Sequence, residues 1–156
     1  MKPRPSAVVE GMIASGQLAK VAADSALAEA ILDKARGRLR SVQRALDAKD
    51  LGECAAPLWD ATRLACAAIL QAQGLRTQGE GHHINTINAV REQYDHLLGG
   101  LLKPANRLRD QRRDDEYPIA VAQQELNADD IKQDLEHVTQ LVDAASLLIP
   151  LVPVYA

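Results

Sequence analysis

Apolar residues recur at intervals of three and four positions over most of this chain. Residues at this spacing share one face of an α-helix, and the alternating β-branched runs that are typical of strands are absent. The most regular pattern follows Asn127, a good helix-capping residue, and consists of Ile131, Leu135, Val138, Val142, Ala145 and Ile149. We therefore predict an all-α fold, an up-and-down bundle of five to six antiparallel helices.

Capping residues and glycines predict where these helices begin and end. The expected helices span about 6–15, 24–47, 50–73, 82–98, 101–117 and 127–149. Asp50 and Glu53 resemble a capping box that opens the third helix, and Gly74 is well placed to end it. Gly99 and Gly100 are expected to end the fourth helix. A polar connector at 75–81 separates these two helices.

The length of 156 residues fits a single domain with a core of its own. We expect a short helix and lead-in at 1–23, the bundle at 24–149 and a C-terminal tail at 150–156. The regular apolar face of the last helix has two interpretations. It packs inside the bundle, or it forms the seam of a homodimer.

The amino-acid composition argues against several classes of protein. A formal net charge of −3 argues against broad adhesion to nucleic acid or anionic lipid, and an aromatic content of 3% without phenylalanine leaves few platforms for stacking bases. No apolar run approaches the length of a membrane span. Cys54 and Cys66 are expected on one helix, about 18 Å apart, too far to bond. We expect a soluble cytoplasmic protein with buried thiols.

The segment 107–118 changes from a helical apolar pattern to almost entirely charged residues. Its arginines alternate with acids, so a solvated helix end with internal pairs such as Arg107 with Asp110 explains it. The competing interpretation is a phosphate-binding site formed by Arg109, Arg112 and Arg113. A planar guanidinium group that a carboxylate orients is well suited to hold phosphate.

Histidines and charges elsewhere offer fewer candidates. The four histidines lack metal-ligand spacing, so we expect neither a metal nor a cofactor. His82 is expected to anchor the loop before its helix. Asp60 and Arg63 lie in an apolar helix and are interpreted as a buried structural ion pair. Alternatively, this pair lines a pocket together with the segment 112–117.

Three segments carry a family resemblance: 58–74 (LWDATRLACAAILQAQG), 79–83 (GEGHH) and 112–118 (RRDDEYP). Together they resemble the HEPN superfamily, and the likeness covers roughly residues 25–148. The resemblance implies a helical bundle, commonly dimeric. Many members are metal-independent ribonucleases of toxin–antitoxin or other defence systems, and others are noncatalytic modules associated with RNA or nucleotides.

The family's signature is an arginine, usually followed by a polar residue, and then a histidine after four to six intervening positions. Arg112 matches the arginine, Arg113 matches the polar position, and Tyr117 stands where the histidine belongs. An unperturbed tyrosine, with a pKa of about 10, is a poor base near neutral pH. The tyrosine in place of histidine therefore argues against catalysis more than it argues against phosphate binding.

Two functional hypotheses follow. In the first, a HEPN-like homodimer binds RNA or a nucleotide phosphate through Arg109, Arg112 and Arg113. If it cuts RNA, the resemblance implies attack of a 2′-hydroxyl on the adjacent phosphate, with Arg112 balancing charge and Tyr117 or His83 carrying the proton. In the second, the protein is a noncatalytic interaction module whose charged helix contacts a partner, for instance an antitoxin.

Overall fold

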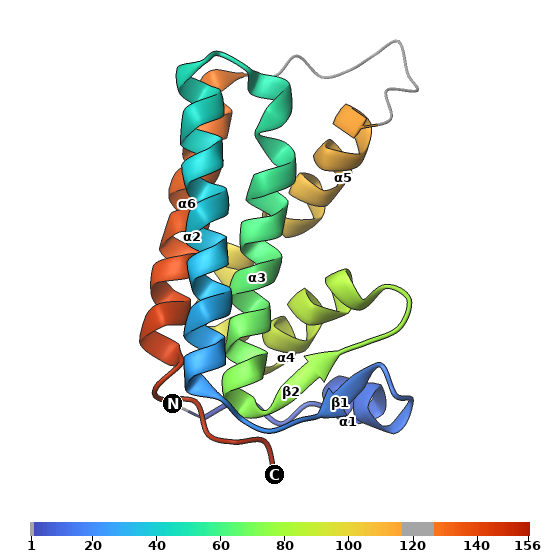
Figure 1. Cartoon of the computed structure of the whole chain (residues 1–156). Coiled ribbons are helices and arrows are strands. Elements are labelled where there is room, and N and C mark those ends of the chain that lie inside the picture. The colour runs from blue at the N-terminus through green and yellow to red at the C-terminus, as the bar shows by residue number, and fades with distance from the viewer. Residues whose placement is uncertain (1, 117–126) are drawn as a thin grey trace.

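The computed structural model describes residues 2–116 and 127–156, without the side chains of residues 114–116. This part of the chain is a helical bundle with a small two-stranded sheet at one end (Figure 1), which confirms the predicted all-α class. Its elements are α1 (Ala7–Ala14), β1 (Leu18–Lys20), α2 (Ser25–Asp47), the 3-10 turn η1 (Leu51–Glu53), α3 (Ala55–Gln73), β2 (Leu75–Thr77), α4 (His82–Leu102), α5 (Ala105–Glu116) and α6 (Ala128–Leu148).

Helix α3 is the centre of the bundle and contacts α2, α4, α5 and α6. Most of its residues are buried, because it is rich in alanine and its small side chains let four helices approach closely. Trp59, on the same helix, is only 2% exposed. Asp60 and Arg63 are the polar residues of α3 that are not fully buried.

The expected helix caps are present. Asp24 accepts a hydrogen bond from the Leu27 backbone N–H at 2.9 Å, and Asn127 accepts one from the Asp129 N–H at 2.8 Å. Gly74 ends α3 in the left-handed conformation, with φ of 79°. A Cβ atom there would lie 2.7 Å from the Val21 carbonyl oxygen, so this turn requires glycine.

Two predicted boundaries are wrong. The Asp50 side chain makes no capping hydrogen bond; η1 follows it, and α3 begins only at Ala55. Helix α4 continues through Gly99 and Gly100 to Leu102, with a kink at Tyr94. Leu98 and Leu102 are buried on this continuation, so burial of their side chains outweighs the low helix propensity of the two glycines.

The sheet was not predicted. β1 pairs antiparallel with β2, in the register that sets Leu18 opposite Thr77 and Lys20 opposite Leu75. Leu18 and Leu75 are both 1% exposed, so the sheet adds to the same core as the helices. The N-terminal lead-in thus packs on the bundle through α1 and β1.

The apolar face of α6 lies inside the bundle. Ile131, Val138, Val142, Ala145 and Ile149 are all buried. The packing interpretation of this face is therefore confirmed, and the dimer-seam interpretation of it is wrong.

Candidate phosphate site between α3, α4 and α5

Arg112 lies on the side of α5 that faces the core. Ala105 and Leu108 pack against α3 and are buried, and Arg112 follows Leu108 by four residues, which places it on the same helix face. Its side chain is half-buried. The apolar row of α5 therefore ends in an arginine at the edge of the core.

Arg109 and Arg113 have a different environment. Both pair with the Asp110 carboxylate, Arg109 through Nε at 3.8 Å and Arg113 through Nη2 at 3.5 Å. Their side chains are 43% and 69% exposed. Solvent screens such exposed pairs, so they hold the guanidinium groups only weakly. Of the three predicted phosphate-binding arginines, Arg112 thus has the most protected position.

Arg107 does not pair with Asp110, contrary to the expectation for this helix. Its guanidinium donates to both carboxylate oxygens of Asp134 on α6, at 3.0 Å from Nη1 to Oδ2 and through a second, shorter bond from Nη2 to Oδ1. The hydrogen bond to Asp134 raises the pKa of Arg107, although desolvation opposes the shift. This bidentate pair joins α5 to α6, so Arg107 has a structural role.

Charged groups from two other helices affect the pKa of His83, which lies at the start of α4. Its pKa is lowered, first by burial and then by the positive charges of Arg63, His82 and Arg112, while Asp60 acts in the opposite direction. Arg63 comes from α3 and Arg112 from α5. The fold therefore brings His83 and Arg112, which are far apart in the sequence, into one electrostatic environment.

Its neighbour His82 anchors the preceding loop, as expected, with Nδ1 3.0 Å from the Gly79 carbonyl oxygen. The two imidazole centroids are 3.8 Å apart. The loop and the ring contact fix where α4 begins, and they thereby position His83.

Asp60 and Arg63 form an ion pair with an Nη2 to Oδ1 distance of 3.7 Å. Their side chains are 27% and 23% exposed, so the pair is half-buried at the surface of α3 and not buried as expected. Arg38 of α2 approaches the second oxygen of Asp60 at 3.7 Å. Sequence reasoning missed Arg38, although the run of basic residues around it was visible in the sequence.

We call Asp60, Arg63, His83 and Arg112 the three-helix cluster, after α3, α4 and α5, which supply them. It holds two guanidinium groups, one carboxylate and an imidazole whose lowered pKa favours the neutral form near pH 7. Two arginines can hold a phosphate group, and a neutral imidazole can accept a proton. Tyr117, the third predicted catalytic residue, lies outside the described residues.

A metal site or a reactive cysteine has less support. In the described ranges, no group of three His, Cys, Asp or Glu side chains could hold a metal ion. Cys54 and Cys66 are both buried thiols. Burial raises the pKa of Cys66 to about 12, which leaves its thiol protonated and unreactive near neutral pH.

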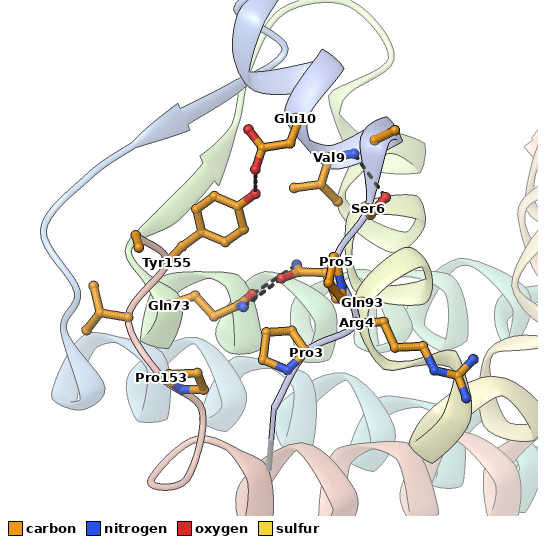
Figure 2. Close-up of a pocket in the computed structure, with 13 residues that line it drawn as sticks. Pro3, Arg4, Pro5, Ser6, Val9, Glu10, Gln73, Gln93, Pro153 and Tyr155 are labelled. Atoms are coloured by element: carbon orange, nitrogen blue, oxygen red, sulfur yellow. Dashed lines mark hydrogen bonds between the residues drawn. The ribbon is translucent and has the colours of Figure 1, made fainter.

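A hollow of about 560 Å³ lies at the other end of the bundle, between the two terminal segments (Figure 2). Gln73 and Gln93 meet between these segments and hydrogen-bond to each other, and Tyr155 points toward Glu10 and donates a hydrogen bond to it. Four of the residues that line the hollow thus hydrogen-bond to one another in two pairs, Gln73 with Gln93 and Tyr155 with Glu10. Nothing in the sequence pattern singled out the two glutamines.

No protein-family model matches the chain, and no curated protein matches it. Across residues 2–116 and 127–156, no helix has both the length and the apolar composition needed to cross a bilayer.

Proposed function

We propose that the protein binds a phosphate group of RNA or of a nucleotide at the three-helix cluster. The observation that carries this proposal is that Arg63 on α3 and Arg112 on α5 both lower the pKa of His83 on α4. Arg63 is held by Asp60 and is half-buried, so its guanidinium is oriented before a ligand arrives. A phosphate that enters this environment meets partly desolvated positive charge, which is more effective than charge exposed to bulk water.

Cleavage of RNA is the further activity that this arrangement supports. Neutral His83 would take the proton of a 2′-hydroxyl, and the 2′-oxygen would attack the adjacent phosphorus. The bond from phosphorus to the 5′-oxygen then breaks, which gives a 2′,3′-cyclic phosphate and, after protonation, a 5′-hydroxyl. Arg63 and Arg112 would balance the negative charge that develops on the phosphoryl oxygens. We propose Tyr117 as the carrier of the proton to the leaving oxygen.

The resemblance to HEPN proteins supports this proposal through Arg112, the arginine of the family's signature. We extend it to a cytoplasmic homodimer of a toxin or defence system, the setting in which many such proteins act. The alternative is a noncatalytic interaction protein. The exposed group of Arg109, Asp110 and Arg113 favours that alternative, because it presents fixed charges to solvent where a partner could dock.

The test compares two double variants with the same change in charge. Arg63→Gln with Arg112→Gln should weaken binding of labelled RNA and of uridine monophosphate by about tenfold or more, because charge-assisted hydrogen bonds are lost. Arg109→Gln with Arg113→Gln is the control and should change both affinities much less. Circular dichroism of each variant checks that the helices remain intact.

The reverse order of effects would refute the proposal. If only the variant of Arg109 and Arg113 weakens binding, the exposed surface is the interaction site. If neither RNA nor the mononucleotide binds to the unmodified protein at low salt, the phosphate site does not exist. Cleavage is followed separately, by the appearance of a 2′,3′-cyclic phosphate end, and should be lost in His83→Ala.

A further inference from the structure

Helix α2 carries an unusual concentration of positive charge. Between positions 34 and 44 the chain has five Lys or Arg residues and no acid, although its formal net charge is −3. Arg36 is half-buried and engaged with Asp33 at 2.6 Å and with Glu29 at 3.8 Å. The other four, Lys34, Arg38, Arg40 and Arg44, are exposed.

These four cations share the outer face of α2. The buried residues of the helix, among them Leu32, Ala35 and Val42, occupy its opposite face. The outer face has a shallow depression of about 680 Å³, lined by Lys34, Arg38, Arg40 and Arg44 and by one acid, Asp33, which pairs with Arg36. Gly37 also lines it, and the absence of a side chain there leaves the depression open.

Most of this charge is unneutralised within the described structure. Lys34 and Arg40 have no ion pair in the described ranges, and Arg44 instead donates a hydrogen bond to Ser41 Oγ at 3.0 Å. Ser41 in turn donates to the Gly37 carbonyl oxygen at 3.2 Å, so Arg44 is oriented by the helix itself. Nothing in the fold of this helix requires exposed cations in such number.

Arg38 connects this face to the three-helix cluster. Its Nε atom lies 3.7 Å from Asp60 Oδ2, and the other oxygen of Asp60 lies 3.7 Å from Arg63. Helix α3 contacts both α2 and α5, and it lies between them in Figure 1. Positive groups therefore extend from the outer face of α2, across α3, toward Arg112 on α5.

We propose that the outer face of α2, through its cations Lys34, Arg40 and Arg44, binds the phosphate backbone of a single-stranded RNA whose reacting phosphate lies at the three-helix cluster. This inference rests on the proposed function and makes the ligand an oligonucleotide in place of a mononucleotide. Ten residues of helix span about 15 Å, roughly the rise of four nucleotides in a stacked strand. The low aromatic content predicts that the backbone, and not the bases, is recognised.

The charge pattern favours a nucleic acid over a lipid surface. Interfacial helices place large apolar residues beside their cations, whereas this face combines its cations with Gly37 and Ser41. A row of separated cations matches the regular negative charge of a polynucleotide.

The experiment measures binding of an oligouridylate of about twelve nucleotides, a length within the usual site sizes of single-strand binders, and of uridine monophosphate. The test variant is Lys34→Gln, Arg40→Gln and Arg44→Gln. The control triple removes the same charge from other exposed positions, as Arg76→Gln, Lys103→Gln and Lys132→Gln. Arg38 is left intact because it contacts Asp60. Melting temperatures should agree among all proteins, since every substituted side chain is exposed.

We expect the α2 triple variant to bind the oligonucleotide severalfold more weakly than the control triple does. The slope of log affinity against log salt should fall by about two, at about 0.7 for each lost phosphate contact. Binding of the mononucleotide should not change. An oligonucleotide affinity and salt slope equal to those of the control triple would overturn the inference.

The cluster variant of Arg63 and Arg112 separates this inference from the proposed function. If it weakens both ligands while the α2 variant weakens neither, the phosphate site stands and the α2 face is not part of it. If the α2 variant weakens the oligonucleotide while the cluster variant changes nothing, the α2 face binds RNA and the proposed site is wrong.

Discussion

Gln73 and Gln93 exchange two side-chain hydrogen bonds in the interior, from Gln73 Nε2 to Gln93 Oε1 at 2.8 Å and from Gln93 Nε2 to Gln73 Oε1 at 3.2 Å (Figure 2). Their backbone carbonyls hold the two terminal segments, since the Tyr155 N–H donates to Gln73 at 2.9 Å and the Arg4 N–H donates to Gln93 at 2.8 Å. One pair of residues thus joins α3, α4 and both terminal segments.

Replacing one glutamine should cost more stability than replacing both. Gln73→Leu leaves the buried Gln93 Oε1 without its donor, although Gln93 Nε2 keeps its hydrogen bond to the Ala89 carbonyl oxygen at 3.1 Å. The free energy of unfolding should fall by about 1 to 3 kcal/mol. The double variant Gln73→Leu with Gln93→Leu should recover part of this loss. Urea unfolding measures all three free energies, and losses that simply add would contradict a coupled pair.

Protonation of His83 should destabilise the fold in acid. Its pKa is lowered in the folded protein, so the unfolded state binds the proton more readily. The free energy of unfolding should therefore decrease as the pH drops below about 6.5, the pKa of histidine in the unfolded state. Well above that pH, His83 is neutral in both states and its protonation no longer affects stability. His83→Gln should flatten that part of the profile, whereas His137→Gln on α6 serves as the control for loss of a histidine.

The same titration also tests the proposed site. A phosphate bound near Arg63 and Arg112 offsets their positive charge and should raise the pKa of His83. Nuclear magnetic resonance of the imidazole, with and without uridine monophosphate, measures the shift. An unchanged His83 pKa at saturating nucleotide would place the ligand elsewhere.

Gly74→Ala should be much more harmful than Gly16→Ala. Both glycines have positive φ, 79° at Gly74 and 80° at Gly16, so alanine costs about 1 to 2 kcal/mol of backbone strain at either position. Only at Gly74 does the new Cβ meet a backbone atom, the Val21 carbonyl oxygen at 2.7 Å. We expect a further loss of about 1 to 3 kcal/mol there. Equal melting temperatures for the two variants would contradict this account.

Self-association, if it occurs as the family resemblance implies, needs a surface other than the buried face of α6. Leu147 and Leu151 are 73% and 54% exposed near the end of that helix. Light scattering should give about twice the 16.9 kDa mass of the chain, and Leu147→Glu with Leu151→Glu should return it to the monomer. Val8→Glu, at another exposed apolar residue, is the control. A monomer at micromolar concentration in the unmodified protein would contradict the prediction.

The helices could be predicted because their signals are local. Apolar spacing and caps such as Asp24 and Asn127 act within a few residues. The sheet could not, since three residues are too short for a strand pattern and the pairing of Leu18 with Thr77 spans the whole of α2 and α3. The extension of α4 past Gly99 depends on burial of Leu102 by the rest of the fold.

The candidate site likewise depends partly on local sequence spacing and partly on the packing of distant helices. The four-residue spacing of Leu108 and Arg112 puts that arginine on the apolar side of its helix, a signal that is present in the sequence but that none of the expectations above used. The partner of Arg107 could not be foreseen, because Asp134 lies on another helix, 27 positions away. The proximity of His83 to Arg63 and Arg112 likewise depends on how α3, α4 and α5 pack.

Trp59 gives this protein a spectroscopic reporter of its own. It is the chain's only tryptophan, it is 2% exposed at the centre of the bundle, and the next residue in the chain is Asp60 of the three-helix cluster. Its emission should be blue-shifted in the folded state and move to longer wavelength only when the packing around α3 opens. Intrinsic fluorescence can therefore follow the opening of the bundle around α3 without any label.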